Sequence, residues 1–247
     1  MKNLPSIQLG DTSIAVSRLS FGTVLMGPRG ENLSPQDGAD LLTHAYRRGI
    51  NYWDTSEDYG THPHIAQALR HISRQQVIIS SKLNLPVKPI DDLLQELNTT
   101  YIDILLVHDV SLNDIDATKA ALQSWQEEKS KSRLRAIGIS THSALVAKVM
   151  YKWPEVEVMM LPINMTGVCL PDQPIEGGIE LMKGIAEKAW TKGKAIIAMK
   201  VMGFGSYADR PKMAIAHVAN LPYVHSLCIG MRSQAEIDQN VHILCSL

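Results

Sequence analysis

The sequence places an aspartate, a lysine and a histidine at the ends of three successive apolar runs, and a tyrosine follows the aspartate five residues later. Asp54 closes "INYWD", Lys82 closes "VIISSK" and His108 closes "IDILLVH". The phenol of Tyr59 has an ordinary pKa of about 10, which makes it a poor proton donor at neutral pH. An ammonium about 4 Å away would favour the phenolate by about 4 kcal/mol at an effective dielectric of about 20. We therefore expect Lys82 to lower the pKa of Tyr59.

The aspartate and the histidine complete this chemistry. A buried lysine without a partner tends to lose its proton, so Asp54 beside Lys82 would keep it charged. His108 could hydrogen-bond a substrate oxygen and orient it. Together the four side chains suit the protonation of a carbonyl oxygen while a hydride arrives at carbon. None of them is a good nucleophile, which argues against acyl transfer.

Short β-branched runs alternate with longer amphipathic segments along the whole chain. Eight runs are predicted strands, at residues 18–23, 50–55, 77–82, 102–108, 134–140, 156–161, 195–200 and 224–230. Several are apolar on both faces, as the strands of a covered parallel sheet must be. Helical patterns fill the gaps, most clearly at 34–49, 176–193 and 233–244, and the first has Ser34 as N-cap and Pro35 at its first position. The sequence therefore predicts a (β/α)8 TIM barrel, as a single domain over residues 1–247.

The start of the chain departs from this rhythm. The alternating stretch "SIQLGDTSIAVS", residues 6–17, turns at "GD" and predicts an N-terminal β-hairpin that caps the bottom of the barrel. Catalytic groups of such barrels lie at the carboxyl ends of the strands, and neighbouring strands are about 5 Å apart. The four side chains should therefore converge at one mouth. Residues 56–58, between Asp54 and Tyr59, are expected to be rim residues.

Composition narrows the function classes. The 247 residues carry a net charge of −1, which gives no sign of a nucleic acid or anionic membrane as partner. The sequence has no apolar run long enough for a transmembrane helix, and its start lacks the apolar region of a secretory signal. The three scattered cysteines suit a reducing compartment, so we expect a cytoplasmic protein. Oligomeric state is left open.

Several motifs, spread over nearly the whole chain, resemble those of the aldo-keto reductase superfamily. They are "LSFGTVLMG", "GINYWDTSEDYG", "IISSKL", "YIDILLVH", "RAIGIS", "INM", "AMKVMGFG" and "IGMRSQAEIDQNV". The resemblance implies reduction of an aldehyde or ketone to an alcohol, or the reverse, with hydride from the nicotinamide of NAD(P)H. It makes Tyr59 the general acid, Lys82 the modulator of its pKa, Asp54 the partner of Lys82, and His108 the group that orients the substrate.

The resemblance also implies a set of cofactor-binding residues at the same mouth. The adenosine end would lie near Arg232, the candidate for a 2′-phosphate, although Glu236 occupies a position that is Arg in many NADPH-preferring members. NADP is therefore expected, with NAD as the alternative. The implied set is Gly22, Thr23, Ser140, Thr141, Asn164, Met199, Lys200, Gly203, Gly230, Met231, Arg232, Gln239 and Asn240.

Other interpretations stay open at this point. The chain could bind the nucleotide and turn over little, as a regulatory protein, or it could be an unrelated phosphate-binding barrel enzyme. Lys200 could contact a cofactor phosphate or could be a solvated lysine at a strand end. The pair His62 and His64 has a spacing that some metal sites use, but no acidic or cysteine partner is evident, so no metal is expected. The identity of the carbonyl substrate is not specified by the sequence.

Overall fold

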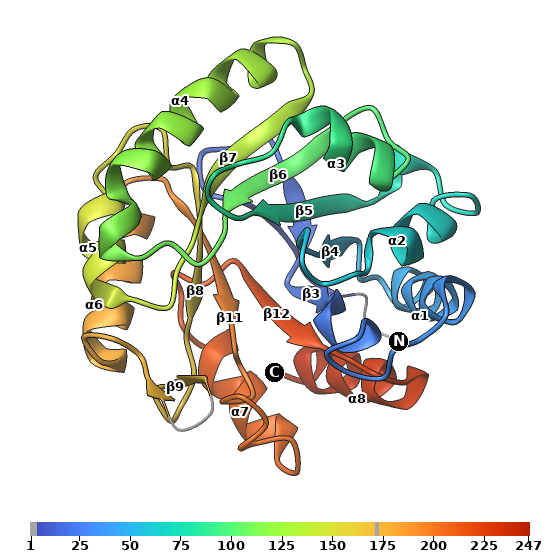
Figure 1. The fold of residues 1–247 in the computed structure, drawn as a ribbon. Helices are drawn as coiled ribbons and strands as arrows, with labels where there is room; N and C mark the ends of the chain where they lie inside the picture. The colour runs from blue at the N-terminus through green and yellow to red at the C-terminus, as the bar shows by residue number, and fades with distance from the viewer. Residues whose placement is uncertain (1–3, 171–172) are drawn as a thin grey trace.

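Eight parallel strands close into a barrel, which confirms the predicted TIM-barrel fold (Figure 1). The computed structural model describes residues 4–170 and 173–247. The strands are β3 (Leu19–Gly22), β4 (Tyr52–Asp54), β5 (Ile78–Leu83), β6 (Ile102–Val107), β7 (Leu134–Ser140), β8 (Val158–Pro162), β11 (Ala195–Met199) and β12 (Ser226–Gly230). The first and last strands of the barrel pair in parallel, with Leu19 opposite Leu227 and Gly22 opposite Gly230.

One α-helix follows each barrel strand. The helices are α1 (Pro35–Arg47), α2 (His62–Ala68), α3 (Ile90–Glu96), α4 (Ile115–Ser130), α5 (Ala144–Met150), α6 (Ile179–Trp190), α7 (Pro211–Ala219) and α8 (Gln234–Cys245). The expected N-cap of α1 is present, since Ser34 Oγ accepts a hydrogen bond from the Asp37 backbone N–H at 3.1 Å. The helices surround the strands in Figure 1 and cover their outer faces.

The N-terminal hairpin forms as predicted, from β1 (Ser6–Gln8) and the antiparallel β2 (Ala15–Ser17). Leu9, Ile14 and Val16 are fully buried and belong to the same apolar cluster as the residues that point into the barrel. The turn is tied to the segment before β11, because the Asp11 backbone N–H donates to the Gly193 carbonyl at 2.8 Å. The hairpin therefore fills the bottom of the barrel with side chains.

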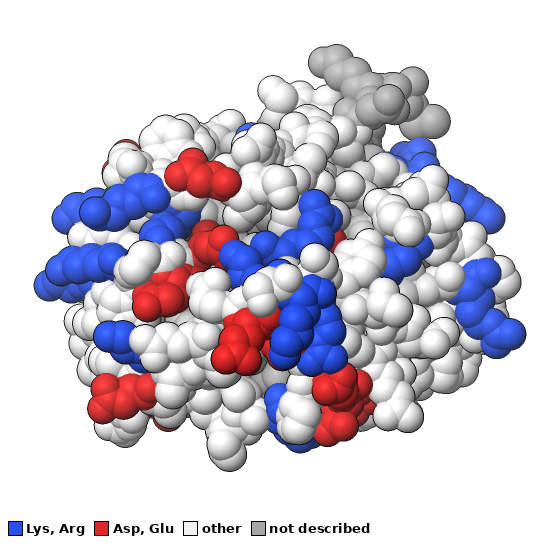
Figure 2. Space-filling view, turned by 90° about the horizontal axis from the view of Figure 1, so that it is seen from above, with Lys and Arg blue, Asp and Glu red and all other residues white. Residues whose placement is uncertain are grey.

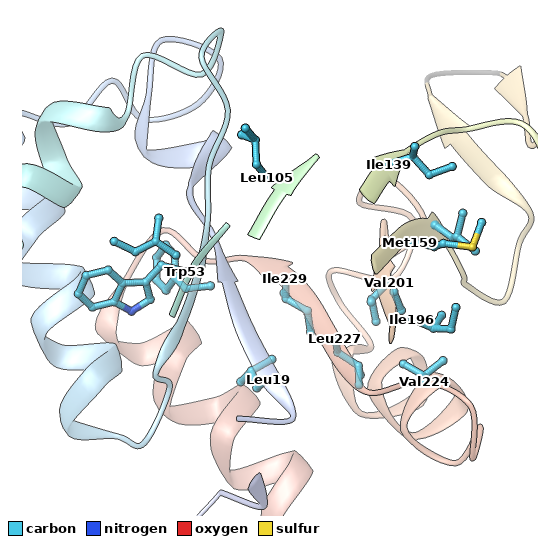
Figure 3. Close-up of a cluster of buried hydrophobic side chains, with 14 of the residues drawn as sticks. Leu19, Trp53, Leu105, Ile139, Met159, Ile196, Val201, Val224, Leu227 and Ile229 are labelled. Atoms are coloured by element: carbon cyan, nitrogen blue, oxygen red, sulfur yellow. The ribbon is translucent and has the colours of Figure 1, made fainter. Parts of the chain in front are cut away.

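The alternation of side chains along each strand decides which residues reach the mouth. On β4, Tyr52 belongs to the cluster inside the barrel, whereas Trp53 packs outward against the helices (Figure 3). The next residue, Asp54, must therefore point inward again. On β5 the same period puts Ile78 inside and Ile79 outside, and so returns Lys82 to the interior. The polar residues at the strand ends thus lie above the apolar filling of the barrel.

Some local features differ from the sequence prediction. Strand β4 covers three residues instead of six, and β6 and β11 end one residue before His108 and Lys200. A two-stranded hairpin of β9 (Val168–Leu170) and β10 (Gln173–Pro174) follows β8 and was not predicted. Short 3-10 helices also occur, at Thr23–Met26 (η1), Arg74–Gln76 (η2) and Leu112–Asp114 (η3).

Candidate active site

An ion pair buried below the mouth of the barrel joins the ends of β4 and β5. The ammonium of Lys82 lies 2.7 and 2.6 Å from the two carboxylate oxygens of Asp54, and both residues are nearly inaccessible, at 1% and 3% exposure. The Thr55 carbonyl oxygen accepts a third hydrogen bond from Lys82 Nζ at 2.8 Å. The Ser80 hydroxyl donates to Asp54 Oδ1 at 2.7 Å. The predicted contact between Asp54 and Lys82 is therefore present.

The charge of Lys82 is fixed by this arrangement. Burial alone would lower the pKa of its ammonium, but the Asp54 carboxylate and its hydrogen bonds outweigh burial and raise that pKa above the ordinary value. Lys82 therefore stays protonated at neutral pH, as the sequence analysis expects of a lysine paired with Asp54.

The ring of Tyr59 lies over the same ion pair. Lys82 Nζ is 5.0 Å from the centroid of the Tyr59 ring. The net pKa shift of Tyr59 is upward, opposite to the expected direction, because burial raises the pKa more than the Lys82 charge lowers it. The Asp54 carboxylate adds to the upward shift by cancelling much of the field of Lys82. The Lys82 ammonium alone would lower the Tyr59 pKa, but its countercharge and burial reverse the direction.

His108 contributes the fourth side chain of the set. Its ring meets the Tyr59 ring edge to face, with centroids 5.8 Å apart and planes at 76°. Burial, assisted by the nearby Lys82 charge, lowers the pKa of His108 to about 4. Its imidazole is therefore neutral at physiological pH. Asp54, Tyr59, Lys82 and His108 thus lie together at one end of the barrel.

One residue next to this set, Ser56, was expected at the rim but is buried. Ser56 is 1% exposed, and its hydroxyl lies 3.1 Å from His108 Nδ1 and 2.6 Å from Asp58 Oδ1. The loop folds inward because the Glu57 backbone N–H donates to the Lys82 carbonyl at 3.1 Å. Neither an alternation pattern nor a motif marks such a loop contact. Ser80 was likewise missed, although its inward position, two residues before Lys82, is a usable signal.

The predicted cofactor residues occupy strand ends around the mouth. Gly22 ends β3 and pairs with Asp54 on one side and Gly230 on the other. Ser140 ends β7 and Met199 ends β11. Four further members are in adjacent segments: Thr23 begins η1, Met231 follows β12, and Gln239 and Asn240 lie on α8. Their contacts with a nucleotide stay a prediction.

Two of these polar residues have their hydrogen-bonding groups engaged by the protein itself. The Asn164 amide nitrogen donates to the carbonyl oxygens of Val168 and Lys200, at 2.9 and 3.1 Å. Its amide oxygen accepts from the backbone N–H of Gly167 at 2.7 Å. The Thr141 hydroxyl donates to the Val110 carbonyl at 2.7 Å. In this structure both residues hold the loops at the mouth in place. Binding the carboxamide of a nicotinamide would therefore compete with these internal hydrogen bonds.

The loop after β11 combines a glycine in the left-handed region with a half-buried lysine. Gly203 adopts φ +56°, and a side chain there would meet Thr166 Oγ1 at 2.9 Å, so glycine is needed. Lys200 is half-buried, and burial lowers its pKa. Within residues 4–170 and 173–247 its ammonium has no salt bridge, and it lies 5.0 Å from the Phe204 ring centroid. A half-buried ammonium without a carboxylate partner fits a diphosphate.

The opposite end of the predicted nucleotide site is acidic. Arg232 is 51% exposed in its side chain, and its guanidinium lies 3.3 Å from Glu236 and 3.6 Å from Glu31. Beside it is a pocket of about 320 Å³ lined by Leu33, Asp37, Asp40, Leu41, Arg232 and Gln234. The arginine predicted to receive a 2′-phosphate is therefore already paired with carboxylates.

The two spaced histidines belong to the packing between elements. His62 Nδ1 lies 2.5 Å from Glu96 and its Nε2 lies 3.3 Å from the Ser81 hydroxyl. His64 Nε2 donates a hydrogen bond to the Leu33 carbonyl, 2.9 Å away, so that nitrogen carries the proton. In the described part of the chain no group of three histidine, cysteine, aspartate or glutamate side chains is placed to hold a metal ion.

Two whole-molecule observations bear on partners. Among the residues that the structure describes, no helix is long and apolar enough to span a membrane. Figure 2 shows that, on the face seen from above, lysine and arginine side chains lie beside aspartate and glutamate side chains near the centre. That face therefore carries no extended patch of one charge.

Comparison with curated proteins links the chain to oxidoreductases. L-galactose dehydrogenase of Arabidopsis thaliana is 28% identical over 149 residues, which cover 53% of this chain and 47% of that protein. NADH-specific methylglyoxal reductase of Escherichia coli is 28% identical over 194 residues, which cover 64% of this chain and 58% of that protein. The chain thus spans about half the length of the curated relatives it matches.

Solved structures and a family model agree on the fold. A Pseudomonas aeruginosa protein assigned to the aldo-keto reductases superposes with a TM-score of 0.79 at 23% identity, over 98% of this chain and 94% of that one. The holo form of an aldo-keto reductase from Bacillus halodurans gives a TM-score of 0.77 at 19% identity, over 98% and 91%. The family model described as "Aldo/keto reductase family" matches residues 18–213. The chain therefore belongs to the aldo/keto reductase family.

Proposed function

We propose that the protein catalyses NAD(P)H-dependent reduction of a small aldehyde or ketone to an alcohol, or the reverse reaction, with Tyr59 as the general acid. The observation that carries this proposal is the buried Lys82–Asp54 pair, 5.0 Å below the Tyr59 ring and beside His108. The two named relatives, a methylglyoxal reductase and a sugar dehydrogenase, support a small carbonyl or hydroxyl compound as substrate.

Each of the four residues has a role in this proposal. The phenol of Tyr59 donates its proton to the carbonyl oxygen, and the permanent charge of Lys82 stabilises the phenolate that remains. Asp54 keeps Lys82 charged and in place, and His108 contacts the substrate. A reduced nicotinamide would supply the hydride, and Gly203 and Lys200 would hold its diphosphate. The neighbouring ammonium matters most after proton transfer, when the negative charge develops on the Tyr59 oxygen.

The test is turnover of NADH and NADPH with a panel of small carbonyls, including methylglyoxal. Tyr59→Phe should lose at least about a hundredfold in kcat, within the usual contribution of general acid catalysis, while still binding the nucleotide. Tyr151→Phe is the matched control, since it removes a half-buried phenol hydroxyl outside the site. Unchanged turnover in Tyr59→Phe would overturn the assignment of the acid. Nucleotide binding without turnover of any carbonyl would instead support the regulatory alternative.

We also propose that the protein binds NADH more tightly than NADPH. A 2′-phosphate at the adenosine end would approach the carboxylates of Glu31 and Glu236, which already pair with Arg232. Those carboxylates suit a ribose 2′-hydroxyl, which can donate a hydrogen bond to them. This changes the sequence-based preference for NADP, because the position of Glu31 beside Arg232 is visible in the fold and not in the motif.

The cofactor proposal has its own experiment. Fluorescence titration should give a lower Kd for NADH than for NADPH. Glu31→Gln and Glu236→Gln should each tighten NADPH binding several-fold and leave NADH nearly unchanged, because each removes one repulsive charge near the 2′-phosphate. Glu180→Gln is the control, since that carboxylate is exposed on α6 and pairs with Lys183. Tighter binding of NADPH by the unmodified protein would overturn this proposal without affecting that of Tyr59.

A further inference from the structure

Ser56, Asp58 and His108 form a closed triangle of polar contacts beside the proposed acid. The Ser56 hydroxyl lies 2.6 Å from Asp58 Oδ1 and 3.1 Å from His108 Nδ1, and His108 Nδ1 lies 3.5 Å from Asp58 Oδ1. The other carboxylate oxygen, Asp58 Oδ2, accepts a hydrogen bond from Arg29 at 2.6 Å. The number of protons on each of the three side chains determines which atom donates and which accepts in this triangle.

The hydroxyl of Ser56 has one proton to give. Asp58 is a carboxylate at neutral pH: burial opposes its ionisation, but the hydrogen bonds from Ser56 and Arg29 and the Arg29 charge outweigh burial and lower its pKa below the ordinary value. A contact of 2.6 Å between a hydroxyl and a carboxylate oxygen requires the proton to lie between them, so Ser56 donates to Asp58. The 3.4 Å contact of Ser56 with the Lys82 carbonyl is too long to compete.

This leaves the Ser56 oxygen as an acceptor toward His108. The proton of that hydrogen bond must then be on His108 Nδ1, where it also faces the Asp58 carboxylate. A neutral imidazole carries one ring proton, so Nε2 has a free lone pair. We propose that Ser56 and Asp58 are positioning residues that fix the proton of neutral His108 on Nδ1 and leave Nε2 as a hydrogen-bond acceptor.

The remaining charges around His108 do not reverse this assignment. The Lys82 ammonium disfavours a second ring proton, whereas the carboxylates of Asp58, Asp109 and Asp54 favour one. Asp109 is itself paired with His142 Nδ1 at 2.6 Å, on the other side of the loop after β6. The Tyr59 ring adds only an edge-to-face ring contact, with centroids 5.8 Å apart. The Ser56–Asp58 contact is therefore the one that selects the tautomer.

A consequence for the substrate follows, and it rests on the proposed function. Tyr59 donates a hydrogen bond to the carbonyl oxygen, whereas His108 accepts one. The group opposite His108 must therefore bring a proton of its own, as a hydroxyl next to the carbonyl would. The geometry points to carbonyl compounds that carry an adjacent hydroxyl as better substrates than their deoxy analogues.

The tautomer is tested directly by 15N NMR of the histidine side chains at pH 7, with His108 assigned by its loss in His108→Gln. The unmodified protein should show the Nδ1–H form. Asp58→Ala frees the Ser56 proton to turn toward Nδ1 and should shift His108 toward the Nε2–H form. Asp58→Asn keeps an acceptor for Ser56 and should retain the Nδ1–H form, as should the control Asp109→Asn. An Nε2–H form in the unmodified protein, or no change in Asp58→Ala, would overturn the proposal.

Kinetics test the consequence separately. Glycolaldehyde and acetaldehyde differ by one hydroxyl, and the unmodified protein should favour glycolaldehyde in KM by about fivefold, the worth of one hydrogen bond. Asp58→Ala should lose this preference, and Asp58→Asn should keep it. Equal KM values would refute the substrate consequence. If neither aldehyde is turned over, the proposed function fails, while the NMR result still decides the tautomer.

Discussion

The Lys82 ammonium has no donor left for the phenol above it. Its three N–H groups are directed at two oxygens of Asp54 and the carbonyl of Thr55, at 2.6–2.8 Å. Lys82 must therefore act on Tyr59 through its charge rather than through a hydrogen bond. Because Lys82 donates no hydrogen bond to the phenolate, burial determines the direction of the Tyr59 pKa shift. The charge that acts on Tyr59 therefore depends on the Lys82–Asp54 ion pair staying intact.

Removing one member of the pair should separate stability from activity. Lys82→Met leaves the Asp54 carboxylate buried without a countercharge, which typically costs about 3–5 kcal/mol of the free energy of unfolding. The double variant Asp54→Asn with Lys82→Met removes both charges and should recover most of that loss. Neither variant should reduce carbonyls at a measurable rate. Urea unfolding and NADH turnover on the same samples check this, and a double variant as unstable as Lys82→Met would contradict it.

At the scale of elements, Gly38 shows how α1 is fitted to its neighbour. It lowers the helical propensity of α1, yet a side chain there would come within 2.2 Å of the buried ring of His64 on α2. Gly38 is therefore required by the close approach of the two helices.

Two glycines in helices should respond oppositely to the same substitution. Gly38→Ala should destabilise the protein by about 1–3 kcal/mol, because the methyl group overpacks the contact with His64. Gly184→Ala on α6 has nothing within 4 Å of the new methyl group and should stabilise by up to about 1 kcal/mol through helix propensity. Thermal or urea unfolding measures both. Equal effects of the two substitutions would show that packing between α1 and α2 does not select Gly38.

A histidine that must stay neutral lies where the hairpin meets the barrel. His225 is 5% exposed, and two backbone N–H groups face its ring, that of Ile196 at Nδ1 (3.0 Å) and that of Gly10 at Nε2 (3.1 Å). A neutral imidazole accepts from one of them, whereas a protonated ring accepts from neither. Burial lowers the pKa of His225 below its ordinary value. Protonation would place a ring N–H against each of these donors and weaken the junction of hairpin and barrel.

The sign of the pH effect follows from that lowered pKa. His225 binds its proton less readily in the folded state than in the unfolded state, so its contribution to stability is present above a pH of about 6.5. It is lost as pH falls through the lower pKa of the folded state. His225→Gln should flatten the decline of unfolding free energy as pH falls below about 6.5, whereas His71→Gln, at an exposed position, should not. The same slope in His225→Gln as in the unmodified protein would refute this.

At the scale of the whole molecule, the proposed cofactor site should link ligand binding to global unfolding. The resemblance assigns this site residues from the ends of β3, β7, β11 and β12, so a nucleotide bound there would contact the closed barrel and not its unfolded chain. NADH at about a hundred times its Kd should add about 2.7 kcal/mol of stability. For a domain of this size that corresponds to a rise in Tm of roughly 5–10 °C. Tyr59→Phe should show the same rise, because its change affects proton transfer and not binding. Absence of any shift with NADH and NADPH would contradict nucleotide binding.

The barrel and its buried ion pair were predictable because their signals repeat. Inward alternation along β4 and β5 and the position of Asp54 and Lys82 at strand ends both follow from the sequence pattern. Contacts made by loops gave no comparable signal. The approach of Ser56 to His108, and of Glu31 to Arg232, depends on backbone turns and on residues far apart in the chain. The sign of the Tyr59 pKa shift required burial and countercharge to be weighed together, which needs coordinates.

The pairing of β3 with β12 has a consequence for how the protein is made. Until residue 230 has emerged from the ribosome, β3 lacks one of its two neighbours and β11 lacks its next strand. The roughly two hundred residues between Gly22 and Gly230 take about 10–40 s to synthesise at about 5–20 residues per second. Throughout that interval β3 keeps one unpaired edge, and the strand made last keeps another, so both can pair with other chains. Chaperone protection during translation, rather than the stability of the finished barrel, should therefore limit the yield of folded protein.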